Sequence, residues 1–266
     1  MEQVQHYFIF REPEDIEELK ALLLLRYSAF MASRLNKFIE RNSAGIDLDC
    51  YDLYSHHFGL FEHMGANSRP AGYVRMVTDQ PQRFRDELFE LSKRDPTLYE
   101  NVNRIPEQPF PLMSYCPYGA EAMEYYLDLK SQGKILTETS RLSVDPSVRG
   151  ASLIHNFVSA IHGYFIALGY HESLVACARG HEPFYRLFGG WQFPHTDLYD
   201  AHGVPFALLL LGGEHLPDAM KERVGCMQNA YERFGRICYD PSHPDNFNPP
   251  LGAFIRSRPV FWPVAA

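Results

Sequence analysis

The sequence has little basic charge and no long apolar run, and each shortage excludes a class of protein. Its 266 residues include 25 Lys or Arg and 33 Asp or Glu, which gives a formal net charge of −8. A general basic surface for nucleic acid or anionic lipid is therefore missing. The longest apolar runs, around 22–25 and 204–211, are far below the roughly 18 residues that cross a bilayer. Because the amino end also lacks a signal-peptide pattern, we expect a cytoplasmic protein without a transmembrane segment.

Cysteine is scarce and its spacing excludes two further classes. The five cysteines are odd in number and contain no C-x-x-C pair, which favours reduced thiols over a disulfide framework. The 12 histidines do not show the spacing of zinc ligands. His155 and His162 fall on the polar side of a predicted long helix, and we interpret them as solvated or core side chains. We therefore predict no metal site and no tightly bound cofactor.

What is present is an alternation of strand and helix patterns. Period-two and β-rich segments predict strands at 6–10, 57–62, 72–78, 134–144, 173–178, 191–194 and 204–211. Apolar residues at helical spacing predict helices at 13–30, 81–95, 120–130, 150–168, 182–188 and 219–234. The proline-rich stretch 106–117 is predicted to be a loop. This order is typical of an α/β fold with a mixed central sheet flanked by helices. We divide the chain into a domain at 1–215 and a C-terminal extension at 216–266 that packs on the same domain.

Arg26 breaks the apolar pattern of the first helix. It lies four residues from both Leu22 and Phe30, on or beside the face that should be buried. A buried arginine needs an acidic partner, and Asp49 or Asp52 is the nearest plausible one. These groups, together with a later arginine at 75, form either a structural clamp or a binding site for the carboxylate or amine of an amino acid.

Glu138 interrupts a predicted strand in a similar way. Strict alternation places it on one face with the aliphatic Leu136, Leu142 and Val144. Burial of a carboxylate raises its pKa toward the range that suits proton abstraction from an amine. Arg141 should face the other side of the strand unless a β-bulge redirects it.

Two segments resemble the GNAT acyltransferase superfamily. Residues 144–150, Val-Asp-Pro-Ser-Val-Arg-Gly, lie between a strand and a helix, and residues 183–189, Pro-Phe-Tyr-Arg-Leu-Phe-Gly, are similar to its F-Y-x-x-x-G-F segment. The resemblance implies that the phosphopantetheine arm of the donor binds at the free N–H groups that open the helix. It assigns this role to Val144, Arg149, Gly150 and Ala151. Two later glycines of the superfamily's R-G-x-G-x-G loop are absent, which disfavours acetyl-CoA and favours a larger acyl donor.

A narrower resemblance joins four motifs in order over about residues 20–195. Arg26-x-x-x-Phe30, Asp49-x-x-Asp52, Val74-Arg75-Met76 and Glu138-Thr139-Ser140-Arg141 are similar to those of acyl-homoserine-lactone synthases and N-acyl amino acid synthases. Acyltransferases of ornithine lipids and those that accompany exosortases share comparable signatures. The lactone synthases carry a tryptophan in their S-adenosylmethionine pocket, whereas this chain has Asn36 in that area, which favours an N-acylated amino acid as product.

The resemblance implies an enzyme that moves a medium or long acyl chain from acyl carrier protein, or from acyl-CoA, to the amine of an amino acid or similar small molecule. Its implied catalytic residues are Glu138, Ser140, Arg141, Leu142 and Tyr185, and its implied substrate-binding residues are Arg26, Phe30, Asp49, Asp52 and Arg75. No metal takes part. Two alternatives remain: a lactone synthase that uses S-adenosylmethionine, and a non-catalytic GNAT-like module that senses acyl groups or amino acids.

Overall fold

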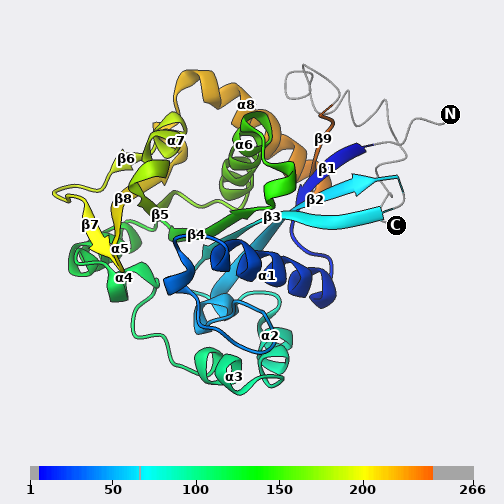
Figure 1. The fold of residues 1–266 in the computed structure, drawn as a ribbon. Coiled ribbons are helices and arrows are strands. Elements are labelled where there is room, and N and C mark those ends of the chain that lie inside the picture. Colours follow the sequence, from blue (N-terminus) through cyan, green and yellow to red (C-terminus); the bar gives the residue numbers. More distant parts are fainter. Residues whose placement is uncertain (1–5, 66, 242–266) are drawn as a thin grey trace.

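A mixed sheet with helices on both faces forms the body of the protein in a computed structural model that describes residues 6–65 and 67–241 (Figure 1). Its strands are β1 His6–Arg11, β2 Ser55–Met64, β3 Asn67–Val77, β4 Leu136–Val144, β5 Glu172–Ala178, β6 Trp191–Gln192, β7 Tyr199–Ala201, β8 Val204–Gly212 and β9 Ile237–Tyr239. Their order in the sheet is β6-β8-β5-β4-β3-β2-β1-β9, and β7 also pairs with β8. Only β4 and β5 are parallel neighbours within this part of the chain.

Eight α-helices cover the two faces over the same residues. They are α1 Ile16–Met31, α2 Arg85–Ser92, α3 Pro96–Val102, α4 Leu112–Tyr115, α5 Gly119–Ser131, α6 Ala151–Ala167, α7 Glu182–Leu187 and α8 Asp218–Phe234. Helices α6 and α8 lie on one face, and α1 lies on the other (Figure 1). We call these the α6 face and the α1 face. No helix in 6–65 and 67–241 has the length and apolar character that a membrane span needs.

Local sequence chemistry explains several of these boundaries. The Asp15 side chain accepts a hydrogen bond from the Glu18 N–H and so caps α1. Asp95 caps α3 in the same way, and Pro96 occupies the first helical position. Gly235, with a φ of 64°, ends α8 in the left-handed conformation that favours glycine.

The strand and helix predictions differ from the structure in four places. The predicted loop 106–117 contains the short helix α4, and α3 falls where no separate helix was expected. The edge strands β7 and β9 were also missed, since each has only three residues.

His162 is buried at 4% exposure and does not lie on a polar side of α6, because α6 is packed on more than one side. The predicted proline-rich tail beyond residue 241 lies outside the described residues.

Strands β4 and β5 separate after a short paired segment. They pair in parallel only over Leu136–Glu138 and Glu172–Leu174. Beyond that point, β4 remains bonded to β3 and β5 remains bonded to β8. The sheet therefore opens immediately after Glu138, which places the backbone of both strands beside a gap.

Helix α8 continues the chain past the predicted domain boundary and packs on α6, and β9 then joins the sheet edge beside β1. The two helices cross closely at Gly163, where a Cβ atom would lie 2.7 Å from the backbone nitrogen of Gln228. We expect Gly163→Ala to lower the free energy of unfolding by about 1–3 kcal/mol in urea denaturation. The backbone of Gln228 cannot move away from the added methyl group unless α8 shifts as a whole.

Gly225→Ala is the matched control, since Gly225 lies in α8 and a Cβ there meets nothing within 4 Å. It should be neutral or stabilising by up to about 1 kcal/mol. Equal unfolding midpoints for the two variants would contradict the close crossing.

Candidate active site

Glu138 occupies the point at which β4 and β5 separate. The residue is 1% exposed, and its Oε2 accepts a hydrogen bond from the Leu112 N–H at 2.8 Å. Burial disfavours the carboxylate and raises the pKa of Glu138 to about 7, although the Leu112 N–H and the Arg75 guanidinium act in the opposite direction. Both protonation states are then populated near neutral pH, so the group can accept a proton and release it again.

A β-bulge follows Glu138 in β4. Tyr73 and Arg75 are two residues apart in β3, whereas their β4 partners, Ser143 and Ser140, are three apart. The extra residue falls at or next to Arg141, which has a φ of 61°, a conformation that strains any residue other than glycine. The side chain of Arg141 is thereby directed to the α1 face, where its ion-pair partners lie.

The bulge corrects the predicted alternation of β4. Leu136, Glu138 and Ser140 contact groups of the α1 face, as alternation requires. Leu142 and Val144 were predicted on that same face, but they pack in the core beneath α6. The prediction is wrong beyond Ser140 because one inserted residue reverses the alternation of everything after it.

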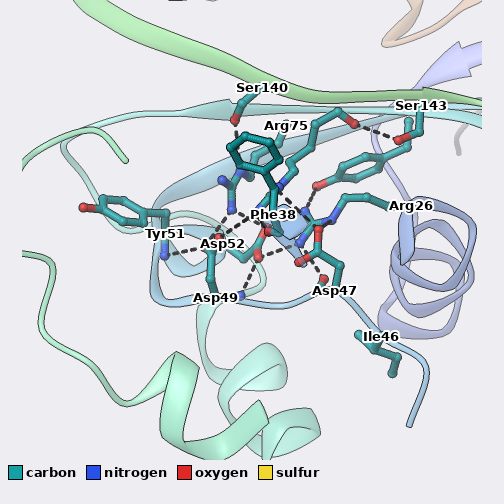
Figure 2. Close-up of polar contacts among 12 residues, drawn as sticks. Arg26, Phe38, Ile46, Asp47, Asp49, Tyr51, Asp52, Arg75, Ser140 and Ser143 are labelled. Carbon is teal, nitrogen blue, oxygen red and sulfur yellow. Dashed lines mark hydrogen bonds and ion pairs between the residues drawn. The ribbon is translucent and has the colours of Figure 1, made fainter. Parts of the chain in front are cut away.

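Arg26 projects from α1 into a fully buried ion pair. Its Nη1 and Nη2 donate to the two carboxylate oxygens of Asp52 at 2.8 and 2.9 Å, and Nε lies 2.7 Å from Oδ2 of Asp47 (Figure 2). Nη1 also donates to the Tyr73 hydroxyl at 2.9 Å. The neighbouring guanidinium groups hold the pKa of Asp52 well below its usual range, despite its burial. Sequence reasoning named Asp52 as a possible partner and missed Asp47.

Arg75 and Arg141 extend this ion pair toward Glu138. Nη1 of Arg75 lies 2.7 Å from Oδ1 of Asp49, and Nε donates to the Ser140 hydroxyl at 3.3 Å (Figure 2). Arg141 lies 3.3 Å from Asp47 and 3.7 Å from Asp49. Its guanidinium also stands 5.3 Å from the centre of the Phe30 ring.

Three arginines and three aspartates thus form one charge-balanced group of ion pairs. We call it the Arg/Asp cluster; it comprises Arg26, Asp47, Asp49, Asp52, Arg75 and Arg141.

Exposure within the Arg/Asp cluster increases from one end to the other. The side chains of Arg26 and Asp52 are 0% exposed and that of Arg75 is 2% exposed. The side chain of Arg141 is 17% exposed and that of Asp49 is 26% exposed. Of the predicted substrate-binding residues, Arg26 and Asp52 therefore form the buried end of the Arg/Asp cluster. Asp49 lies at the exposed end, where a small molecule could reach it. The buried guanidinium of Arg26 is already paired with the carboxylates of Asp47 and Asp52.

Three tyrosines that sequence reasoning did not identify lie within electrostatic range of Glu138. Burial raises the pKa values of Tyr51 and Tyr199, and the charge of Glu138 raises the pKa values of these two groups and of Tyr115, which is 48% exposed. They come from the 3-10 helix Cys50–Tyr54, from α4 and from β7, which are far apart in the sequence. No spacing rule connects these segments, so only the fold reveals that they meet.

The predicted donor-binding residues lie at the start of α6. Nε of Arg149 donates to the carbonyl oxygen of Val144 at 2.9 Å. Gly150 is the N-cap of α6 without a side-chain cap, and Ala151 is the first helical residue. The amide groups of the first turn are therefore oriented outward from the helix end, as an anion-binding helix terminus requires.

Tyr185 lies on the α6 face, opposite Glu138. It lines a pocket where β4 and β5 separate, and we call this the apolar pocket. The apolar side chains that line it are Val74, Leu142, Val158, Ile161, Phe165 and Leu211. Burial raises the pKa of Tyr185, so its hydroxyl stays protonated and can donate a hydrogen bond or a proton.

No protein-family model matches the sequence, and no curated protein matches it. Among solved structures, FeeM, an N-acyl amino acid synthase from uncultured soil microbes, aligns with a TM-score of 0.51 at 15% identity, over 79% of this chain and 94% of FeeM. BjaI, a CoA-dependent acyl-homoserine lactone synthase, aligns at a TM-score of 0.49 and 15% identity over 79% and 81% of the two chains. The AHL synthase LasI aligns at 0.47 and 12% identity over 79% and 91%.

The similarity to FeeM concerns the fold. It confirms the predicted α/β class and GNAT-like fold, and it confirms the resemblance to N-acyl amino acid synthases at the level of structure. At 15% identity it assigns neither a substrate nor a catalytic residue to this chain.

Proposed function

We propose that the protein is an N-acyltransferase that moves a medium or long acyl chain from acyl carrier protein, or from acyl-CoA, to the amine of an amino acid or a similar small molecule. The observation that carries the proposal is Glu138, a buried carboxyl group with a pKa of about 7 at the point where β4 and β5 separate. A proton acceptor at that position suits an amine nucleophile that attacks a thioester held in the gap.

The proposed reaction uses both faces of the sheet. The amine approaches from the α1 face, and its nitrogen forms a bond to the thioester carbonyl carbon while Glu138 takes the proton that the nitrogen loses. Backbone N–H groups at Arg141 and Leu142, where the bulge interrupts the regular ladder with β3, would stabilise the oxyanion. The C–S bond then breaks, and the hydroxyl of Tyr185 gives a proton to the leaving thiolate. Tyr185 regains a proton from solvent, and Glu138 returns its proton to solvent.

The exposed end of the Arg/Asp cluster supports an amino-acid acceptor. Asp49 offers a carboxylate to an ammonium group, and Arg141 offers a guanidinium to a carboxylate. Arg75 and Ser140 connect this end to Glu138, because Ser140 contacts both the Arg75 guanidinium and the Glu138 carboxyl group. The amine of a bound amino acid would then lie between a group that holds it and a group that deprotonates it.

Asp49→Asn tests the acceptor site. We expect KM for the amine to rise about 10- to 100-fold with a smaller change in kcat, because a hydrogen bond to a charged group is worth about 1.5–3 kcal/mol. The measurement is steady-state kinetics with the acyl donor at saturation. Asp79→Asn is the matched control, since Asp79 is 27% exposed and pairs with Lys130 outside the Arg/Asp cluster. An unchanged KM in Asp49→Asn would argue against this site.

The function itself is tested by thiol release. Acyl carrier protein thioesters and acyl-CoA thioesters of several chain lengths are incubated with pooled amino acids, with and without S-adenosylmethionine, and the products are identified by mass spectrometry. An N-acyl amino acid supports the proposal and names both substrates. Methylthioadenosine in the products would replace it with a lactone synthase. A ligand-dependent shift in Tm without thiol release from any donor would replace it with a sensing module.

A further inference from the structure

A cavity that the proposed reaction does not use lies at the end of the sheet where β5 begins and β8 ends. It is lined by 170–172 after α6, by 212–215 at the end of β8, and by Lys134 and Ile166. We call it the end cavity. It shares no lining residue with the apolar pocket, and no member of the Arg/Asp cluster lines it. Its volume is about 280 Å³, enough for roughly nine water molecules, so it has room for a small organic molecule.

The walls of the end cavity are held by contacts within the protein. The Tyr170 hydroxyl lies 2.7 Å from Nε2 of His56, and Nδ1 of His56 lies 2.9 Å from a carboxylate oxygen of Glu12. On the opposite wall, the His215 ring packs against Trp191 with the ring centres 3.8 Å apart. The cavity therefore has its walls in position before any ligand enters, which reduces the entropy cost of binding.

Two side chains of opposite charge line the end cavity without an ion-pair partner. The Lys134 ammonium and the Glu214 carboxylate form no ion pair within residues 6–65 and 67–241, either with each other or with another group. Glu172 also lines the cavity, but its carboxylate already accepts a hydrogen bond from the Tyr125 hydroxyl. Lys134 precedes β4 and Glu214 follows β8, and these two strands flank β5. The unpaired charges thus come from the two sides of the cavity and sum to zero.

His171 adds a hydrogen-bond donor on the side of Lys134. The Ile135 N–H donates to Nδ1 of His171 at 3.1 Å, so Nδ1 holds the lone pair and the ring proton lies on Nε2. Because Ile135 follows Lys134 directly, this bond ties the His171 ring to the backbone beside the ammonium group. In the part of the chain that the structure describes, Nε2 of His171 has no hydrogen-bond partner. An ammonium group and an N–H on one side form a site suited to a carboxylate.

We propose that the end cavity binds a small zwitterion, with a free apolar amino acid as the class to test. The carboxylate of the ligand lies against Lys134 and Nε2 of His171, and its ammonium group lies against Glu214. Ile166 and the ring of Tyr170 offer apolar surface to its side chain. A ligand with a single charge pairs with only one of the two charged residues, so the zwitterion is preferred. The inference does not rest on the proposed acyltransferase function.

Isothermal titration calorimetry of the full chain, without any acyl donor, tests the proposal. Leucine is the zwitterionic probe, and its size matches the cavity. The probes with a single charge are 4-methylpentanoate, which is leucine without the ammonium group, and 3-methylbutylamine, which is leucine without the carboxylate. We expect leucine to bind with a Kd of about 1 mM or tighter, and each of the other two to bind about 3- to 30-fold more weakly.

Three variants identify the end cavity as the place of binding. Lys134→Met and Glu214→Gln should each weaken leucine binding about 3- to 10-fold, because each removes one charged contact of a partly exposed site. Lys221→Met is the matched control, since Lys221 pairs with Asp218 on α8 and does not line the cavity, and it should leave the Kd unchanged. Asp49→Asn alters the exposed end of the Arg/Asp cluster and should retain this binding event.

Three results overturn the proposal. The first is no binding of leucine at ~20 mM. The second is an equal Kd for leucine and for either probe with a single charge. The third is a leucine Kd that Lys134→Met and Glu214→Gln leave unchanged and that Asp49→Asn raises, which would place the amino acid at the Arg/Asp cluster. Thiol release tests acyl transfer separately, so failure of one proposal leaves the other standing.

Discussion

Glu138→Gln is expected to lower kcat by about 10²- to 10⁴-fold at saturating amine, because the amide cannot take the proton that the nucleophile loses. In the unmodified protein, kcat/KM for the amine should rise with pH and level off above about 7, which is the pKa of the buried carboxyl group. In Glu138→Gln, kcat/KM should not show this rise with pH. Stopped or continuous thiol-release assays across pH 5–9 give both quantities.

Thermal unfolding of Glu138→Gln and of the unmodified protein distinguishes a loss of catalysis from a loss of folded protein. The folded pKa of Glu138 lies above its ordinary value of 4.5, so the folded state retains a proton that the unfolded state has released. The stability tied to that proton is fully present below about pH 4.5 and is lost as pH rises through about 7. Glu138→Gln removes the cost of burying the charge, and its glutamine oxygen can still accept from Leu112. The variant should therefore unfold at an equal or higher temperature than the unmodified protein at pH 8.

Glu172→Gln is the matched control for activity. Glu172 lies on β5 at the paired end of the two strands and accepts a hydrogen bond from Tyr125, away from the Arg/Asp cluster. Its activity should stay within about twofold of the unmodified protein. Full turnover in Glu138→Gln would remove Glu138 from the mechanism and would leave the amine to be deprotonated by solvent.

Arg26→Met is expected to lower the free energy of unfolding by about 3–5 kcal/mol, because it leaves the buried carboxylates of Asp47 and Asp52 with one compensating guanidinium fewer. Asp52→Asn should have a loss of similar size, since it leaves Arg26 and Arg75 facing each other with one carboxylate fewer. Urea denaturation at pH 7 measures both. The double variant should lose less than the sum of the single losses, because each substitution removes the same contact.

Two further measurements identify the ion pair as the cause. Lys93→Met breaks a pair with Glu90 whose side chains are 48% and 69% exposed, and it should change stability by less than about 1 kcal/mol. The lowered pKa of Asp52 also has a signature in acid. Its stabilising contribution is present above the ordinary aspartate pKa of 3.8 and is lost as pH falls below it. Additive losses in the double variant would mean that Arg26 and Asp52 act independently.

The architecture and the presence of buried ionisable residues at 26 and 138 were largely predictable from the sequence. Two residues violate a simple pattern, because an arginine lies among leucines and a glutamate lies in an aliphatic strand. A violated pattern in a stable protein requires a compensating partner. The strand-to-helix junction was a third recognisable feature. Periodicity placed most strands and helices, because the apolar face of each element must be buried. The motifs from Arg26 to Arg141 indicated the GNAT-like fold that the similarity to FeeM shows.

The tertiary structure decided which of those residues meet and how deeply each is buried. Asp47 partners Arg26 and Arg141 because the loop before the 3-10 helix Cys50–Tyr54 folds over α1, and nothing in its spacing distinguishes it from Asp49. The bulge at Arg141 depends on the register with β3, which no local pattern encodes. The helical pattern placed His162 on the polar side of its helix and left open whether it is solvated or in the core, and the packing around α6 buries it. The chemistry of each side chain determined which buried residues require a polar partner. Packing between distant segments determined which group provides that partner.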